Sequence, residues 1–110
     1  KLLTPKDFNG TIVKFNGRPG MIMFFADWCG HCQRAKDLWM KFRKAGGKKY
    51  TIGAVDTEKH EELTRRFNVR SFPSIFIVDT NGKLIPYQGQ RDFFELVLEM
   101  CKSVKDHSMC

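Results

Sequence analysis

The feature that most constrains the fold is a continuous apolar run, Met21-Ile22-Met23-Phe24-Phe25-Ala26, in which no polar residue alternates with the apolar ones. Arg18-Pro19-Gly20 precedes the run and Asp27 follows it, so residues that interrupt regular structure bound it on both sides. A short apolar run of this kind is typical of a strand that is buried on both faces. The run therefore predicts an α/β fold, with this strand in the centre of the sheet and covering layers on each side.

The segments that follow predict a helix, a second strand and a second helix. Apolar residues within 30–45 fall at helical spacing, and Gly46-Gly47 comes after them as expected of a helix C-terminus. Residues 50–55 predict a strand, and Asp56-Thr57 can cap a polar helix over 58–67. In that helix Glu61 and Glu62 lie four positions before Arg65 and Arg66, the spacing of paired charges on one face.

The rest of the chain predicts a hairpin and a last helix. Residues 74–78 and 84–88 read as antiparallel strands joined by the turn Asp79-Thr80-Asn81-Gly82-Lys83. A helix over about 91–104 carries one apolar stripe, made of Phe94, Val97, Leu98 and Cys101. Near the N-terminus, Thr4 and Pro5 predict a capped turn, and residues 11–15 an edge strand. We expect one domain over residues 1–110, a mixed sheet with helices on both faces, and a flexible tail over roughly 105–110.

Composition excludes several classes of protein. The formal net charge is +7, but Lys and Arg are spread along the chain, which favours a solvated basic face over a nucleic-acid site. The longest apolar run has six residues, far short of the roughly 20 that span a bilayer. No signal-peptide pattern begins the chain, and no Lys-Asp-Glu-Leu type retention signal ends it, so the compartment stays open.

Two of the four cysteines, Cys29 and Cys32, form a Cys-x-x-Cys motif where the central strand passes into the first long helix. Unpaired backbone N–H groups and the helix dipole favour the thiolate of Cys29 at that position, and the thiolate is the reactive form. Cys32 lies in the first helical turn, close enough to form a disulfide with Cys29 but more sheltered. The motif predicts an exposed attacking cysteine and a buried resolving one.

The residues around the cysteines fit the same chemistry. A partly protonated His31 would stabilise the thiolate, and stabilising the reduced form makes the disulfide a better oxidant. Gly30 would permit a tight turn and leave the Cys29 sulfur uncrowded. Trp28 offers an apolar flank for an unfolded polypeptide. We therefore expect Cys29 and Cys32 to be catalytic, with His31 and Gly30 tuning the redox potential.

The motif Trp28-Cys29-Gly30-His31-Cys32 resembles the active site of the protein disulfide isomerase branch of the thioredoxin superfamily. Ser71-Phe72-Pro73-Ser74 resembles the family's cis-proline loop, and Val55-Asp56 the end of its next parallel strand. Tyr87-Gln88-Gly89-Gln90-Arg91 resembles the segment before the last helix, where isomerase-type domains carry an arginine that moves toward the resolving cysteine.

This resemblance implies a thioredoxin-like fold and an enzyme that forms or isomerises disulfides in proteins. It implies that Trp28, Phe72 and a cis Pro73 bind substrate and that Arg91 tunes the redox pair. It implies no metal and no organic cofactor. The expected partners are unfolded or partly oxidised proteins and a thiol redox partner or glutathione, without nucleic acid or membrane. We expect a monomer in an oxidising compartment such as the ER lumen.

Two positions depart from the family pattern. Relatives usually carry a buried acidic residue six positions before the first cysteine and a lysine just before the Val-Asp pair, where this chain has Met23 and Ala54. The buried carboxylate would accept the proton of the resolving cysteine, because a thiol must become a thiolate before it attacks. We expect slower resolution of mixed disulfides here, with Asp27, Arg91 or water substituting for the missing pair.

Alternatives remain open from the sequence. Within the same chemistry, the chain could be a thioredoxin-type disulfide reductase. From another class, it could be a peptide-binding or chaperone module with an incidental Cys-x-x-Cys, or a zinc domain that adds Cys101, His107 or Cys110 to the pair. A purely structural Cys29–Cys32 disulfide would close too small a loop to stabilise much. Cys101 fits better as a small core residue than as a reagent.

Overall fold

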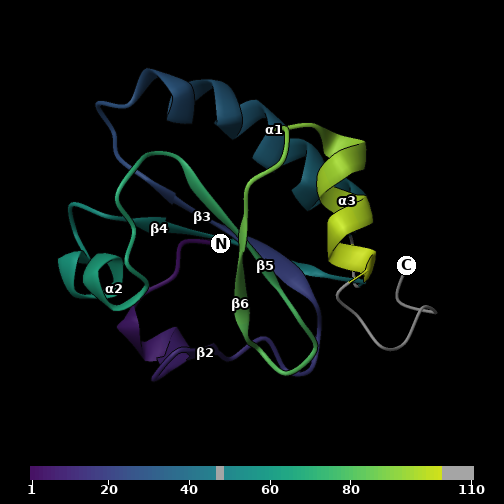
Figure 1. Ribbon diagram of the computed structural model, residues 1–110, viewed down its shortest axis with the longest axis horizontal. Coiled ribbons are helices and arrows are strands. Elements are labelled where there is room, and N and C mark those ends of the chain that lie inside the picture. The colour runs from purple at the N-terminus through teal and green to yellow at the C-terminus, as the bar shows by residue number, and fades with distance from the viewer. Residues whose placement is uncertain (47–48, 103–110) are drawn as a thin grey trace.

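The computed structural model describes residues 1–46 and 49–102. Figure 1 shows a central sheet with helices on either side of it. In chain order the elements are the 3₁₀ turn η1 (Pro5–Asp7), β1 (Phe8–Asn9), β2 (Ile12–Val13), β3 (Gly20–Phe25), α1 (Gly30–Gly46), β4 (Thr51–Asp56), α2 (Glu61–Arg66), β5 (Ser74–Val78), β6 (Leu84–Tyr87) and α3 (Phe93–Lys102). No helix within the described ranges is long and apolar enough to cross a membrane.

The main sheet is mixed, and the apolar run lies inside it as predicted. The strand order is β4-β3-β5-β6, with β3 parallel to β4 and antiparallel to β5. The hairpin prediction is confirmed, because β5 pairs antiparallel with β6 across the turn at 79–83. All six residues of β3 are buried. A strand with neighbours on both edges and layers on both faces satisfies its backbone groups inside the sheet and exposes no side chain.

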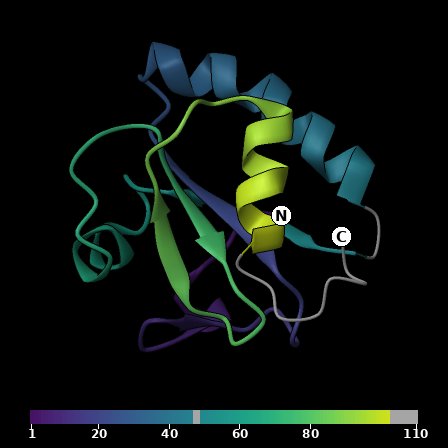
Figure 2. The ribbon, with the colours of Figure 1, turned by 45° about the vertical axis from the view of Figure 1, so that its right-hand side comes forward.

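Successive side chains of β3 belong to two separate hydrophobic cores, as the alternation of a strand requires. Met21, Met23 and Phe25 belong to the core formed with α1 and α3. Ile22 and Phe24 belong to the other core, formed with α2 and the N-terminal segment. Figures 1 and 2 together show α1 and α3 covering one face and α2 lying across the opposite one. The predicted thioredoxin-like architecture, with helices on both faces, is confirmed.

The second helix is shorter than the predicted 58–67. Asp56 does not cap α2; its Oδ1 accepts hydrogen bonds from the backbone N–H groups of Glu58 (3.0 Å) and Lys59 (3.3 Å). That carboxylate stabilises a turn, and the chain must complete the turn before a helix can begin. The predicted charge pairs are present on α2: Glu62 lies 2.6 Å from Arg66, whereas Glu61 and Arg65 are 4.0 Å apart.

The last helix, α3, does not bury the apolar stripe that was predicted for it. It is rotated about its axis, so that a neighbouring set of apolar residues faces the core. Phe94 and Leu98 are 78% and 53% exposed, whereas Leu96 and Met100 are fully buried. Val97 and Cys101 are half-buried against the core, and Cys101 is disulfide-bonded, which the sequence did not predict. Both faces of α3 carry apolar residues at helical spacing, so the pattern does not select between them. The expected helix end at 103–104 and the tail, with His107 and Cys110, lie outside the described residues.

The N-terminal segment follows the predicted capped turn but contributes less strand than expected. The Thr4 side chain accepts from the N–H of Lys6, and the Asp7 carboxylate accepts from the N–H of Thr4. Only Ile12–Val13 of the predicted 11–15 strand is regular, and it pairs with β1 in a separate sheet. The short hairpin follows from the turn between the strands, where Gly10 has a φ of +63°.

Candidate active site

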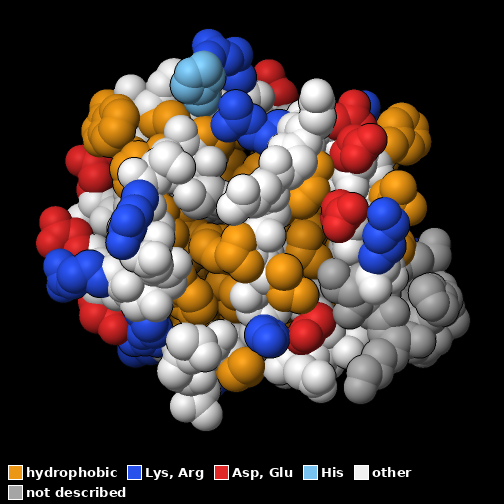
Figure 3. Space-filling model, viewed as in Figure 1, with side chains coloured by type: hydrophobic (Ala, Val, Ile, Leu, Met, Phe, Trp, Pro, Cys, Tyr) orange, Lys and Arg blue, Asp and Glu red, His pale blue; other side chains and the backbone are white. Residues whose placement is uncertain are grey.

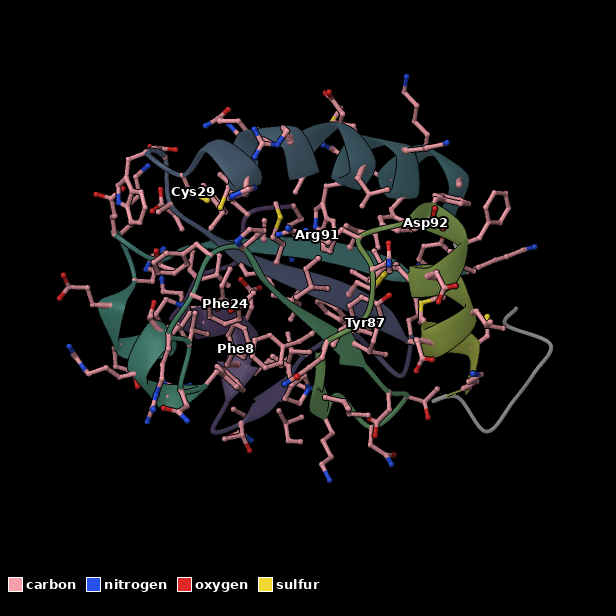
Figure 4. All side chains as sticks on the ribbon, turned by 45° about the horizontal axis from the view of Figure 1, so that its top comes forward. Phe8, Phe24, Cys29, Tyr87, Arg91 and Asp92 are labelled. Atoms are coloured by element: carbon pink, nitrogen blue, oxygen red, sulfur yellow. The ribbon has the colours of Figure 1, made fainter. Side chains whose placement is uncertain are left out.

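Cys29 lies in the turn between β3 and α1, directly before the first helical residue (Figure 4). Its N–H donates to the carbonyl of Ala26 (3.1 Å), and its own carbonyl accepts from the N–H of Gln33 (3.2 Å). Its sulfur accepts the N–H of Cys32 at 3.1 Å. This is the geometry of an N-cap residue, whose side chain satisfies a free N–H of the first turn. The helix start therefore holds the Cys29 sulfur in one place.

The surroundings of this sulfur favour negative charge. The Cys32 N–H points at the sulfur, and the first turn of α1 contains no acidic residue. The positive end of the helix dipole adds to the same effect, and a thiolate is the form that attacks disulfides. Cys29 and Cys32 are both free cysteines, so the structure represents the reduced pair.

Cys29 is less exposed than expected. Its exposed fraction is 5%, against 0% for Cys32, so the two cysteines differ in the predicted order but Cys29 is recessed. The cause is the capping geometry itself, because the side chain turns back over the helix end to reach the N–H of Cys32. A substrate sulfur must therefore approach Cys29 within the shelter of the surrounding loops.

Burial, together with the hydrogen bond to Cys29, raises the pKa of Cys32 to about 11. The positive charge of Arg91 acts in the opposite direction and lowers that pKa. Arg91 stands on the segment between β6 and α3 (Figure 4). The fold thus brings the charge of Arg91 within electrostatic range of Cys32, although the two residues are far apart in sequence.

The segment that carries Arg91 is held by Tyr87, a contact that the sequence reading missed. The Tyr87 hydroxyl donates to the carbonyl of Gln90. A Cβ on Gly89 would lie 2.5 Å from that hydroxyl oxygen, so a larger residue at position 89 would displace the Tyr87 side chain from this contact. In the sequence, the only indication of this contact is that a tyrosine stands two residues before a glycine. Tyr87 and Gly89 together keep the residue before Arg91 in place.

Met23 and Ala54 are direct neighbours across the parallel pairing of β3 with β4. Met23 is 2% exposed and belongs to the same core cluster as Cys32, against which Ala54 is packed. The two positions that depart from the family pattern are therefore adjacent, in the layer that contains Cys32. Within the described residues, none of the groups that shift the pKa of Cys32 is a carboxylate.

An aromatic pair, made of the exposed Trp28 and the half-buried Phe72, lies beside Cys29. Trp28 is 70% exposed, and its ring meets that of Phe72 edge to face, with centroids 5.7 Å apart. The Phe72–Pro73 peptide bond is cis, the isomer that the resemblance implies. Ser74 follows, and its hydroxyl donates to the carbonyl of Ser71 at 2.6 Å. The fold joins residues 28 and 72 into one apolar surface next to the active-site turn.

Gly30 does not have the backbone role expected of it. Its φ is outside the left-handed region, which among the described glycines is occupied by Gly10, Gly17 and Gly82. A Cβ at Gly30 would meet no atom within 4 Å. The turn can therefore accept another residue at position 30. Of the two roles expected of Gly30, the one that fits the structure is that it leaves open space at the helix start.

The side chain of Arg34 contacts His31, a contact that was not predicted from the sequence. Arg34 Nη2 contacts His31 Nδ1 on the exposed side of α1. Their spacing of three residues is the one that places side chains on the same helix face, so it was a usable signal. Gln33 stabilises the turn before α1, because its side-chain amide donates to the carbonyl of Asp27 at 3.1 Å.

A groove of about 880 Å³ begins at the cis-proline loop. Segments 67–76 and 86–91 form its walls, and Arg91, which acts on Cys32, is part of the lining together with Pro73. Figure 3 shows apolar side chains gathered in a hollow on this face of the molecule. The sequence did not reveal the groove, because its two walls come from separate segments. Polar and apolar side chains share the lining, among them Asn68, Val69, Arg70 and Gln88.

The described residues do not assemble the zinc site considered from the sequence. Across 1–46 and 49–102, no three His, Cys, Asp or Glu side chains come close enough to hold a metal ion. Cys29 and Cys32 together supply two sulfurs, and two of the further ligands considered, His107 and Cys110, fall outside these ranges.

Comparison with known proteins gives the same family from sequence and from structure. The thioredoxin family model matches residues 1–102. Protein disulfide-isomerase A6 of Mesocricetus auratus is 40% identical over 90 residues, covering 81% of this chain and 20% of that protein. Protein disulfide-isomerase tigA of Aspergillus niger is 35% identical over 98 residues, covering 86% of this chain and 27% of that protein.

Among solved structures, the J-Trx1 fragment of ERdj5 superimposes with a TM-score of 0.78 at 27% identity, covering 92% of this chain and 49% of that one. The chain thus spans between a fifth and about a quarter of the length of the two curated relatives. The match to the family model covers every element described above. The chain belongs to the thioredoxin family.

Proposed function

We propose that this chain is a protein disulfide isomerase-like thiol–disulfide oxidoreductase domain. One observation carries the proposal: the Cys29 sulfur accepts the N–H of a fully buried Cys32 at the start of α1. A sulfur held at a helix N-terminus beside a sheltered second thiol is arranged for exchange, since one thiol reacts and the other resolves. The similarity to disulfide isomerases at 35% and 40% identity supports the same activity.

The reaction passes through a mixed disulfide in both directions. In oxidation, a substrate thiolate attacks the Cys29 sulfur of the Cys29–Cys32 disulfide, and Cys32 leaves and takes up a proton. A second substrate thiolate then attacks the substrate sulfur, which releases the Cys29 thiolate and leaves the substrate oxidised. In isomerisation, the Cys29 thiolate attacks a substrate disulfide, and either a substrate thiolate or Cys32 displaces it. After a substrate has been oxidised, glutathione disulfide or another disulfide partner accepts the two electrons and re-forms the Cys29–Cys32 disulfide; where Cys32 has displaced a substrate, two glutathione thiols reduce the pair again and become glutathione disulfide.

The neighbouring residues supply substrate binding and tuning in this proposal. Trp28 and Phe72 form an apolar platform at the cysteine, and the cis Pro73 segment offers backbone to an extended chain. Arg91 favours the thiolate of Cys32 when that cysteine must attack. Unfolded or partly oxidised proteins are the proposed substrates, because apolar side chains and an extended backbone are what the platform can bind.

We further propose that the domain acts in an oxidising compartment and as a monomer, with no nucleic acid, membrane or metal partner. In the two curated relatives the matched part is a fifth to about a quarter of the protein. A longer chain could therefore direct this same chemistry to chosen substrates. The domain's own exchange reaction is what the following experiment measures.

The test compares the wild-type chain with Cys29→Ser and Cys32→Ser in the refolding of a reduced and a scrambled protein substrate in glutathione buffer. We expect Cys29→Ser to abolish catalysis, because the attacking sulfur is gone. Cys32→Ser should accumulate a covalent complex with substrate through Cys29, visible by non-reducing electrophoresis, because the resolving sulfur is absent.

Two matched measurements separate the alternatives. Catalysis that survives Cys29→Ser would contradict the enzyme and favour a chaperone. A reduction potential near the −270 mV of thioredoxin, rather than near the roughly −180 mV of disulfide isomerase, would favour the reductase. Stoichiometric zinc in the purified chain would favour the metal domain.

A further inference from the structure

The groove at the cis-proline loop carries positive charge on both of its walls. Arg70 lies on the wall formed by 67–76, and Arg91 at the end of the wall formed by 86–91. Among the described residues that line the groove, none is Asp or Glu. Within 1–46 and 49–102 neither arginine has an ion-pair partner, whereas Arg66, on α2, is paired with Glu62. The groove therefore favours a carboxylate over a neutral or a basic side chain.

The end of α2 orients Arg70. The helix ends in a Schellman motif, in which the N–H of Val69 donates to the carbonyl of Thr64 (2.9 Å) and the N–H of Asn68 to that of Arg65 (3.1 Å). This motif requires the left-handed conformation that Asn68 adopts, with a φ of +56°. The side-chain oxygen of Asn68 accepts from Arg70 Nε at 3.2 Å. That bond uses one of the five N–H donors of the guanidinium group and leaves those on both Nη atoms for a carboxylate.

The groove is continuous with the surroundings of the cysteine pair. Arg91 lines it and also acts electrostatically on Cys32. Pro73 lines it as well and directly follows Phe72, whose ring meets that of the exposed Trp28. At about 880 Å³ the groove is within the size range of ligand-binding clefts. A substrate segment that enters the groove therefore lies next to the residues that surround the reactive pair.

A second, smaller pocket adjoins the groove and carries the opposite charge. It has a volume of about 270 Å³, shares residues 86–89 with the groove, and has Glu95 and Glu99 in its lining. Lys102 lies 3.4 Å from Glu99 and offsets part of that charge. Among the described residues that line this pocket, none is Lys or Arg. Because like charges repel, an acidic side chain is directed away from this pocket and toward Arg70.

We propose that the groove binds an extended acidic segment of the substrate protein, with a carboxylate on Arg70, so that the domain prefers disulfides flanked by Asp or Glu. The inference rests on the proposed thiol–disulfide exchange and names the class of substrate for that site. Arg70 determines the specificity, and Asn68 is a positioning residue that acts through Arg70.

The first experiment measures binding without any redox step. The probes are three short peptides of sequence Gly-Val-Xaa-Ser-Xaa-Val-Gly with blocked ends, in which Xaa is Glu, Gln or Lys and Ser replaces the reacting cysteine. NMR titration of the ¹⁵N-labelled wild-type chain gives the Kd and locates the site. We expect the Glu peptide to bind about three- to tenfold more tightly than the Gln peptide at low salt, and the Lys peptide to bind most weakly. The largest backbone shifts should fall within 68–71 and 88–91, and salt should reduce the preference.

Three variants separate the role of Arg70 from the general attraction of a basic protein. Arg70→Gln should reduce the ratio of Glu-peptide to Gln-peptide affinity to below about twofold. Arg65→Gln is the matched control, because it removes the same charge from an exposed position outside the groove lining, and it should keep the wild-type ratio. Asn68→Gly retains the left-handed conformation but loses the amide, so the ratio should fall partway. A merely structural role of Asn68 would leave this ratio of two affinities unchanged.

The second experiment connects binding to exchange. The same peptides, with cysteine in place of Ser, are activated as 2-pyridyl disulfides. The Cys29 thiolate attacks the peptide sulfur, forms the Cys29–peptide disulfide and expels 2-thiopyridone, whose absorbance gives the second-order rate constant. We expect the rate constants to fall in the order Glu, Gln, Lys, and to differ less in Arg70→Gln.

The outcomes distinguish the two proposals. Equal affinities for the Glu and Gln peptides, shifts outside the groove, or an equal loss of preference in Arg65→Gln and Arg70→Gln would overturn the acidic-segment proposal. Reaction at Cys29 without a preference for the Glu peptide would overturn it too. A chain whose Cys29 reacts with none of the peptides would contradict the proposed function instead, while the binding measurements still decide whether the groove selects acidic segments.

Discussion

Burial has two opposite effects on Cys32: it shelters the thiol from solvent, and it disfavours the thiolate that would react. Its side chain is fully buried, and burial raises its pKa to about 11. At neutral pH it is therefore a thiol that does not attack the Cys29 sulfur until it loses its proton. Met23 and Ala54, the two positions that depart from the pattern expected from the resemblance, are apolar and adjacent. Proton removal from Cys32 is thus the step that this chain leaves least assisted.

The first prediction concerns the pH dependence of that step. Because the pKa of Cys32 is raised, the thiolate fraction is small at neutral pH and grows about tenfold for each pH unit below the pKa. A mixed disulfide on Cys29 should therefore be resolved about tenfold faster per pH unit from neutral pH upward. Stopped-flow release of a chromophoric thiol from Cys29 measures the rate. A rate that levels off below about pH 9 would contradict a raised pKa.

The second prediction restores the absent pair. Met23→Glu together with Ala54→Lys should speed resolution at neutral pH, since a carboxylate in the layer of Cys32 can accept its proton. The same stopped-flow assay compares the double variant with the wild-type chain. Equal rates would mean that water already accepts the proton fast enough, or that the charge of Arg91 already lowers the pKa of Cys32 sufficiently.

The single variant Met23→Glu is the control for the double one. A buried carboxylate without the lysine is an uncompensated charge, and we expect it to lower the free energy of unfolding by about 3–5 kcal/mol. Adding Ala54→Lys should recover part of this loss, because residue 54 pairs with residue 23 in the sheet. Urea unfolding of the three proteins measures both effects.

At the scale of single elements, α3 shows where periodicity alone is insufficient. Its apolar residues outnumber the positions that one face can bury, so two overlapping stripes satisfy the helical pattern. Leu96 and Met100 meet the sheet, and Phe94 and Leu98 face solvent. Phe93 stacks on Phe42 of α1 at 4.9 Å between centroids, a contact that orients the start of the helix. The packing partner, and not the helix sequence, selects the buried face.

The third prediction tests this orientation of α3. Leu96→Ala should lower the free energy of unfolding by about 2–5 kcal/mol, because it leaves a cavity at a fully buried position. Leu98→Ala, two positions along and 53% exposed, should cost less than about 1 kcal/mol. Urea unfolding measures the loss for each variant. A larger loss for Leu98→Ala than for Leu96→Ala would mean that the face predicted from the sequence is the buried one.

At the scale of the whole molecule, the N-terminal segment is held against the far edge of the sheet. The N–H of Leu3 donates to the carbonyl of Ala54 (2.8 Å), and the N–H of Ala54 donates to that of Lys1 (2.9 Å). Leu3 is 1% exposed and belongs to the core on the α2 face. A Cβ on Gly53 would lie 2.6 Å from the Leu3 side chain, so glycine at residue 53 makes room for it. The chain start thus covers an edge of β4.

The fourth prediction follows from that arrangement. Leu3→Ala should lower the free energy of unfolding by about 2–5 kcal/mol despite its position near the chain end. Leu2→Ala, at a neighbouring residue that is 66% exposed, should change it by less than about 0.5 kcal/mol. Thermal or urea unfolding compares the two, and equal values would mean that the segment contributes no core packing.

The sequence by itself determined the elements whose cause is local. The apolar run at 21–26, the strand at 74–78 and the hairpin turn after it follow from side-chain alternation and turn residues that act over a few positions. The same local chemistry places Cys29 at a helix start, where free N–H groups favour its thiolate. These features need no knowledge of distant segments.

Tertiary structure alone decided what depends on contacts between distant segments. It brought Arg91 within range of Cys32, set Trp28 against Phe72, and turned α3 so that Leu96 is buried. It also recessed Cys29, which the motif predicted to be exposed. Burial and electrostatic range are properties of three-dimensional proximity, and when several faces are apolar or several charges are available, only the packed chain selects among them.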